Sequence, residues 1–266
     1  AGDMTPAMFD FTDFGNTNSG SGFLERTFTV KNNGPDGTLN LGTITIDGVN
    51  AADFTVTAQP ALTALGAAQT TTFTVRYQPQ AAGGDLRYAR INIPSDDADT
   101  PTFQFAIFGT ADMVSVGTQG LRYKVITSGN GDRAAQTDDG LRVNYTGKLV
   151  DNVTVFDSSL NPGRQPFTFT IGGNVIQGWS QGLAGVTAGE TRFLVIPPAL
   201  GYGAQGSGSS IPPQATLFFE VSVLDVEAPD LKITGNGVEL VNGDDAPSAD
   251  KGTDFGSVPV AGDATA

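Results

Sequence analysis

The chain has 266 residues, 39% of them hydrophobic, and its 28 acidic and 14 basic side chains give a net charge of −14. This charge makes nucleic acid and anionic membranes poor partners, because neutralising phosphates requires clustered Lys and Arg. The chain contains no His and no Cys, which excludes disulfides, thiolate chemistry and the usual zinc and Ser/His/Asp sites, and no cofactor or metal is expected.

The first part of the chain, residues 1–112, is predicted to be a succession of short strands. Apolar and polar side chains alternate, as in strands with one buried face, and turn residues gather in NNGPDG (32–37) and PSDDADTP (94–101). About seven such strands in about 110 residues predict an immunoglobulin-like β-sandwich. The predicted inward positions are Phe28, Val30, Leu39, Leu41, Ile44, Ile46, Phe54, Val56, Phe73, Val75, Tyr77, Ala89, Ile91, Ile93, Phe103, Phe105 and Ile107.

Several stretches of this part share a family likeness. They are GDMTPAMFDFTDFG (2–15), FTVKNNG (28–34), ITIDGVNAADFTV (44–56), FTVRYQP (73–79) and PTFQFAIFGTA (101–111). In these motifs the segment resembles the bacterial choice-of-anchor D, or ASPM-SPD-Hydin-like, repeats. The resemblance implies a spacer or surface module without a catalytic site, in a secreted or surface-attached bacterial protein, and therefore an extracellular location.

A short connector, DMVSVGTQG (112–120), leads into the second part, residues 113–229. The run VIQGWSQGLAGV predicts a short helix that carries Trp179 and Leu183 on one face. No run in the chain approaches the roughly 18 apolar residues of a membrane helix. Five motifs follow one another: VNYTGKL (143–149), VFDSS (155–159), PFTFTIGGNVIQGW (166–179), GLAGVTAGE (182–190) and PALGYGAQGSGSSIPPQATLFFEVSVLDV (198–226).

In their order and spacing these motifs resemble FKBP-type peptidyl-prolyl cis-trans isomerases. The resemblance implies an α+β fold in which an antiparallel half-barrel sheet wraps around one short helix, so the whole chain is expected to be mainly β with two domains. It also implies an active site between the sheet and the helix. The implied activity is that of a rotamase in protein folding, acting on X–Pro bonds of proline-containing polypeptides, with macrolides of the FKBP class as inhibitors.

The residues of this site have two interpretations. Taken alone, Trp179 and its aromatic companions would be ordinary core residues, and Asp157 a solvated turn residue. The resemblance implies instead that Trp179 is the floor of a proline pocket, Asp157 its carboxylate, and the Tyr202 hydroxyl and the Ile176 N–H donors to substrate carbonyls. The other implied pocket residues are Tyr145, Phe156, Phe167, Val175, Ile211 and Phe219.

The implied chemistry suits a chain without imidazole or thiol. Rotation about an X–Pro bond breaks no bond to carbon, so it needs neither a nucleophile nor a proton shuttle. Arg164 is predicted to pair with Asp157. The alternative function is a non-catalytic binding or spacer module of a surface adhesin-like protein.

The third part, residues 230–266, contains an internal repeat. GDDAPSADKGTDFG (243–256) aligns without a gap with GDMTPAMFDFTDFG (2–15), and seven of the fourteen positions are identical. The tail is therefore predicted to be the truncated beginning of a second sandwich repeat. It is expected to be weakly ordered beyond Gly243, with DLKITGNGVEL (230–240) docked, in a monomeric chain. The acidic clusters at 96–99 and 244–254 are predicted to be solvated turns rather than Ca²⁺ sites.

Overall fold

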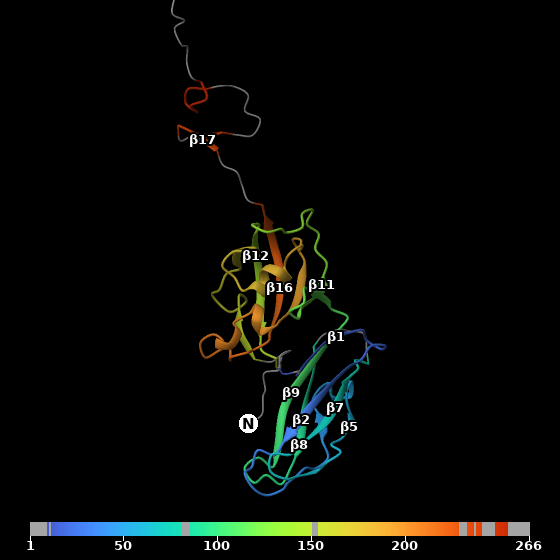
Figure 1. The fold of residues 1–266 in the computed structure, drawn as a ribbon. Coiled ribbons are helices and arrows are strands. Elements are labelled where there is room, and N and C mark those ends of the chain that lie inside the picture. Colours follow the sequence, from blue (N-terminus) through green and yellow to red (C-terminus); the bar gives the residue numbers. More distant parts are fainter. Residues whose placement is uncertain are drawn as a thin grey trace, which may run out of the picture. The chain divides into compact units, whose positions relative to one another are not determined.

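A computed structural model of the protein describes residue 10 and residues 12–80, 86–150, 154–228, 233–236, 238–240 and 248–254. The chain divides into two compact units, Ala1–Glu227 and Ala228–Ala266. Strands dominate the first unit, and within the described ranges α1 (Gln177–Gly182) is its single α-helix (Figure 1). The prediction of a mainly β chain is confirmed. Of the helices in these ranges, none has the length and apolar character needed to cross a membrane.

Residues 13–111 form two main sheets. The first has the strand order β1-β9-β8-β4, from β1 (Asp13–Thr17), β9 (Thr102–Ala111), β8 (Arg87–Pro94) and β4 (Thr45–Asp47). Strand β1 is parallel to β9, whereas β9 pairs antiparallel with β8, and β8 pairs antiparallel with β4. The second is antiparallel, with the order β2-β7-β5, from β2 (Leu24–Lys31), β7 (Thr70–Tyr77) and β5 (Phe54–Ala58). The short strands β3 (Leu39–Asn40) and β6 (Ala64–Leu65) pair with each other, and the 3-10 turn η1 (Ala51–Asp53) precedes β5.

One apolar core joins these two sheets. Its rings come from both of them: Phe28 of β2 stacks on Phe73 of β7 with centroids 5.3 Å apart and lies 5.2 Å from Phe105 of β9. The predicted inward positions contribute to this core with one exception. Phe103 is 45% exposed, because it is the second residue of β9, at the edge of the core, where its ring lies 6.3 Å from that of Phe105.

Residues 114–227 form a single antiparallel sheet of seven strands. Its order is β10-β11-β15-β16-β12-β13, and β14 pairs with β12. The strands are β10 (Val114–Val116), β11 (Leu121–Thr127), β12 (Gly140–Lys148), β13 (Val155–Ser158), β14 (Phe167–Thr170), β15 (Thr191–Ile196) and β16 (Leu217–Glu227). The prediction that residues 112–120 are only a connector is wrong, because Val114–Val116 pair with β11 as the edge strand of this sheet.

The helix α1 lies against this sheet at short range, as the sequence predicts. Trp179 and Leu183 are buried in the same cluster as Leu194 and Ile196 of β15. A Cβ atom on Gly178 would lie 2.3 Å from the Ile196 Cγ2 atom, so only glycine permits this approach.

A buried arginine fixes the end of the helix. Arg192 of β15 donates from Nη1 to the carbonyls of Gly182, at 2.8 Å, and Ala184, at 2.9 Å. Its Nε donates to Glu190 at 2.6 Å, and both side chains are less than 10% exposed. The carbonyl of the last residue of α1 and that of Ala184 just beyond it thus find a donor inside the protein, which holds the helix end in place on the sheet.

The second unit contains one described hairpin, in which β17 (Ile233–Gly235) pairs antiparallel with β18 (Val238–Leu240). Residues 241–247 and 255–266 lie outside the described residues, as do residues 1–9 and 11. Most of the predicted repeat, at 2–15 and 243–256, therefore falls outside the described part of the chain, and the sandwich beginning stays a prediction.

Candidate active site

A cavity of about 500 Å³ opens beside α1, next to the seven-stranded sheet of residues 114–227. It is lined by Tyr145, Phe156, Asp157, Phe167, Asn174, Val175, Ile176, Trp179, Tyr202 and Phe219. Every predicted site residue except Ile211 is on this list. Residues from four strands, the helix and the segment before the helix thus converge on one space, although they are spread from position 145 to position 219.

Trp179 lies at the centre of the aromatic lining. Its ring meets Tyr145 of β12 at 5.2 Å, Phe219 of β16 at 5.3 Å and Phe167 of β14 at 5.9 Å, each in an edge-to-face arrangement. This geometry is favourable for aromatic pairs. The side chain is only 4% exposed, and its Nε1 is buried with no hydrogen-bond partner in the described part of the chain. The floor of the cavity is therefore a buried indole ring packed closely among other aromatic rings.

A glycine explains how the aromatic wall closes. Gly147 of β12 pairs in register with Phe219 on one side and Asp157 on the other. A Cβ atom here would lie 2.6 Å from Phe156 Cζ and 2.7 Å from Phe219 Cε1. The absent side chain lets these two rings meet edge to face at 5.4 Å.

The carboxylate at the cavity rim is Asp157, and three donors hold it. The Tyr145 hydroxyl donates to Oδ2 at 2.5 Å, and the Ser158 N–H donates to Oδ1 at 2.9 Å. Arg164 forms an ion pair with Oδ1, so the predicted pairing of Arg164 with Asp157 is confirmed. The carboxylate therefore points in one direction, with its charge shared between a phenol and a guanidinium.

These contacts move two pKa values in opposite directions. Burial raises the pKa of Asp157, but the hydrogen bonds from Tyr145 and Arg164 and the charge of Arg164 outweigh it, so the net pKa is lowered. Burial, followed by the hydrogen bond to Asp157, raises the pKa of Tyr145 to about 12. At neutral pH the pair is thus a phenol that donates to a carboxylate.

The segment before the helix supplies backbone and amide groups. The Ile176 carbonyl accepts the Trp179 N–H at 3.0 Å, whereas the Ile176 N–H makes no hydrogen bond to the described residues. Asn174 lines the cavity but was not predicted, although it stands between Gly173 and the predicted Val175 in the same GGNVIQGW motif. Its position next to a predicted lip residue was the signal that could have identified it.

The segment that contains η2 (Pro198–Leu200), η3 (Gly203–Gln205) and the loop up to Ile211 forms the other rim. Tyr202 is 40% exposed there and lines the cavity. Ile211 is not among the residues that line the cavity: it is 6% exposed and belongs to the core cluster, so its predicted contact with substrate stays a prediction. The Ile211 N–H donates to the Ser207 carbonyl at 3.1 Å, and the Ile211 carbonyl accepts the Ser207 N–H at 2.9 Å, which closes the loop.

The acidic turn at 96–99 uses its carboxylates locally. Asp97 Oδ1 accepts the N–H groups of Asp99 and Thr100, and Asp96 accepts from Asn40. Over the described ranges, no three acidic side chains gather in a way that could hold a metal ion. Asp244 and Asp245 lie outside those ranges.

The fold and the cavity define a class of protein: an α+β domain with an aromatic pocket, a fixed carboxylate at its rim and no nucleophile. Comparison with known families narrows this class. Residues 131–224 match the family described as "FKBP-type peptidyl-prolyl cis-trans isomerase". This segment is an FKBP-type peptidyl-prolyl cis-trans isomerase domain.

Individual relatives agree with this assignment. The chain is 53% identical over 96 residues to "FK506-binding protein 2B" of Rhizopus delemar, covering 36% of this chain and 46% of that one. It is 57% identical over 90 residues to human "Peptidyl-prolyl cis-trans isomerase FKBP2", covering 34% and 62%. It is 48% identical over 107 residues to "FKBP-type 22 kDa peptidyl-prolyl cis-trans isomerase" of Escherichia coli, covering 40% and 50%. The chain thus spans less than two thirds of the length of each of these relatives.

Proposed function

We propose that the chain catalyses the cis–trans isomerisation of X–Pro bonds at the aromatic cavity. The observation that carries this proposal is the convergence of Tyr145, Asp157, Trp179 and Phe219 on one cavity of about 500 Å³. A pyrrolidine ring and its flanking amide fit such a space, which lies within the usual range of small-ligand sites.

The physical task is to favour a twisted amide over a planar one. The planar X–Pro bond is held by resonance, with a barrier of about 18–20 kcal/mol, and uncatalysed exchange takes tens to hundreds of seconds. Twisting weakens the amide dipole, so an apolar pocket disfavours the planar form more than the twisted form. An acceleration of about 10⁵ requires only about 7 kcal/mol of such preference.

Each lining group has a role in this proposal. The pyrrolidine ring lies on the Trp179 indole, between the aromatic edges of Tyr145 and Phe219. The free N–H of Ile176 and the hydroxyl of Tyr202 donate to the carbonyls that flank the proline. Asp157 acts through its charge and its hydrogen bonds and transfers no proton.

The test is a proline-limited peptide assay with the full chain. We expect faster exchange than in buffer, most of all with an apolar residue before the proline, and loss of the acceleration in Trp179→Ala. Leu224→Ala, a change at a 38% exposed position of β16 outside the cavity lining, is the control and should keep the activity. A folded chain whose rate equals that of buffer would refute the proposal and favour a binding or spacer module.

The same pocket is proposed to bind macrolides of the FKBP class. The name of the Rhizopus relative states that it binds FK506, and the cavity here is lined mainly by aromatic and aliphatic side chains. Because Trp179 is the sole tryptophan, its fluorescence should change on titration with FK506. An unchanged emission spectrum at saturating macrolide would contradict this.

We also propose that the isomerase domain is part of a modular secreted or surface protein. The support is the strand pattern of residues 1–112, which suits an immunoglobulin-like sandwich of the choice-of-anchor D kind, and the sequence repeat at 243–256. The chain is proposed to be a monomer, which light scattering would test. Protease shaving of intact cells that produce the protein would test its exposure.

A further inference from the structure

The seven-stranded sheet of residues 114–227, here called the isomerase sheet, has a second buried face opposite the pocket. Side chains alternate along β15 and β16, so Leu194 and Phe219 point to the pocket core while Val195 and Phe218 point the other way. Both of these outward residues are nonetheless buried, at 0% and 1% exposure. Their cover must come from outside the sheet.

The cover comes from the strand-rich first part of the chain. Phe108 of β9 meets Phe218 edge to face, with ring centroids 5.6 Å apart. Met113 and Val150 complete the cluster around them, and all of these side chains are less than 10% exposed. An apolar contact therefore links β9 to the outer face of the isomerase sheet.

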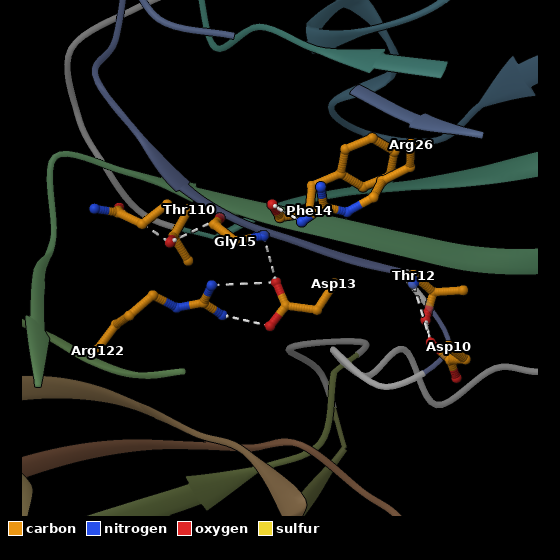
Figure 2. A network of polar contacts seen from close by, with 9 residues as sticks. Asp10, Thr12, Asp13, Phe14, Gly15, Arg26, Thr110 and Arg122 are labelled. Carbon is orange, nitrogen blue, oxygen red and sulfur yellow. Dashed lines mark hydrogen bonds and ion pairs between the residues drawn. The ribbon is translucent and has the colours of Figure 1, made fainter. Parts of the chain in front are cut away.

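A buried ion pair lies beside this apolar contact. Arg122 of β11 donates from Nη2 to Asp13 Oδ2 at 2.8 Å and from Nη1 to Asp13 Oδ1 at 3.2 Å (Figure 2). Both side chains are at most 3% exposed. The guanidinium also lies 5.5 Å from the centre of the Phe108 ring, and the Gly15 N–H donates to Asp13 Oδ1 at 2.8 Å. The forked pair is thus shielded from water, and Arg122 Nε is buried with no hydrogen-bond partner among the described residues.

Strand register explains why these groups meet. On the isomerase side Arg122 pairs with Val195, which in turn pairs with Phe218, so the three form one row across adjacent strands. On the other side Asp13 pairs with Phe108 across β1 and β9. The paired residues Asp13 and Phe108 thus face the two ends of this row. Asp13 lies opposite Arg122, and Phe108 lies opposite Phe218.

The link between the two parts is short, and Asn16 holds it at Met113. Strand β9 ends at Ala111 and β10 begins at Val114. Between them the Asn16 side chain donates to the Met113 carbonyl at 2.9 Å and accepts the Met113 N–H at 3.2 Å. The chain therefore has little freedom to separate the two faces.

We infer that the strand-rich first part is a structural cap on the outer face of the isomerase sheet, and that the two unfold as one cooperative unit clamped by Asp13 and Arg122. This gives the first part a role in maintaining the pocket that is more than spacing. The inference does not depend on catalysis, because it concerns the folding of the pocket and not its activity.

Trp179 provides a reporter for this test, because the sole tryptophan lies in the isomerase part. We expect Asp13→Asn, made in the full chain more than 100 residues away in sequence, to lower the midpoint of thermal unfolding seen by Trp179 fluorescence by about 5 °C or more. The matched control is Asp47→Asn, which removes a carboxylate from a similarly forked pair with Arg90 that is 39–48% exposed. This control should leave the Trp179 midpoint within about 1 °C.

A Trp179 midpoint that is the same in Asp13→Asn, Asp47→Asn and the unaltered chain would overturn the inference. So would two separate transitions in the unaltered chain, one by circular dichroism of the strands and one by Trp179. If Asp13→Asn does not fold, Phe108→Leu decides by the same criterion, since it keeps an apolar side chain and loses the ring contact with Phe218.

Discussion

Replacing Gly147 by alanine should displace the aromatic side chains that line the pocket. The added Cβ atom would lie 2.6 Å from Phe156 Cζ, 2.7 Å from Phe156 Cε2 and 2.7 Å from Phe219 Cε1. Carbon atoms in contact prefer about 3.5–4.0 Å, so both rings must retreat by about 1 Å. Phe219 cannot retreat alone, because it is 4% exposed and packed on Trp179 at 5.3 Å.

The magnitude follows from two opposing effects. Overpacking of this kind costs about 1–3 kcal/mol, whereas the reduced freedom of the unfolded chain returns about 0.4–1 kcal/mol. The net loss of about 0–2.6 kcal/mol corresponds to a midpoint lowered by up to about 10 °C. Because a displacement of about 1 Å can reduce catalysis up to about 100-fold, the isomerase rate should fall by about 10- to 100-fold.

Thermal unfolding followed by Trp179 fluorescence and the proline-limited assay measure the two effects. The control is Gly140→Ala at the start of the same strand, where a Cβ atom would lie 3.6 Å from its nearest neighbour, Glu227 Cβ. This variant should be as stable and as active as the unaltered chain. If Gly147→Ala behaves like Gly140→Ala in both measurements, the aromatic wall is not as tightly packed as the structure implies.

Three further predictions concern the rim and the helix. Asp157→Ala should lower the isomerase rate more than tenfold while the unfolding midpoint changes by only about 1–2 °C, because its side chain is 40% exposed; equal losses would mean that Asp157 is structural. The lowered pKa of Asp157 means that its stabilising contacts are complete above its unfolded pKa of about 3.9 and are lost as the pH falls through the lower folded value. The change in Trp179 fluorescence on addition of FK506 should therefore be constant from pH 8 to 5 and differ only below about pH 4. A pH titration of this change with its midpoint above pH 5 would contradict the prediction. Gly178→Ala should lower the midpoint despite the better helix propensity of alanine, because its Cβ would lie 2.3 Å from Ile196 Cγ2; a raised midpoint by circular dichroism would count against the close packing of α1.

Local patterns predicted much of the fold. Alternation along β7 and β8 identified the buried residues Val75 and Ile91, because a strand with one buried face repeats every two residues. The short helix was predicted from Trp179 and Leu183, four positions apart. The exception, Phe103, has the same period, but it lies at the beginning of its strand, where alternation cannot tell how far the core extends.

The pocket was predicted only because several motifs occurred together. Taken singly, Tyr145 and Phe219 have the pattern of core residues, and core residues they also are, since both pack on Trp179. The burial of Ile211 could not be predicted, because a loop residue before two prolines carries no periodicity from which its direction can be inferred. Its burial depends on the Ser207 bridge, which closes the loop.

Contacts between distant segments left no pattern in the sequence. Asp13 and Arg122 are 109 residues apart, and each stands in a strand where a charged residue ordinarily faces water. Their meeting depends on the register of β1 with β9 and of β11 with β15, which alternation does not determine. The three residues of β10 were likewise too few to show a period.

The buried pair of Asp13 and Arg122 limits how evolution or engineering can recombine this chain. A chimaera that joins residues 12–111 to another isomerase segment without an arginine at the position of Arg122 would bury a lone carboxylate, and the reverse graft would bury a lone guanidinium. Either hybrid would be at a disadvantage against the parental combination, even with a faultless pocket. A hybrid joined at the two-residue link of Asp112 and Met113 therefore keeps the stability of the parent only when Asp13 and Arg122 are both retained. The two parts of the chain are thus expected to recombine as one unit.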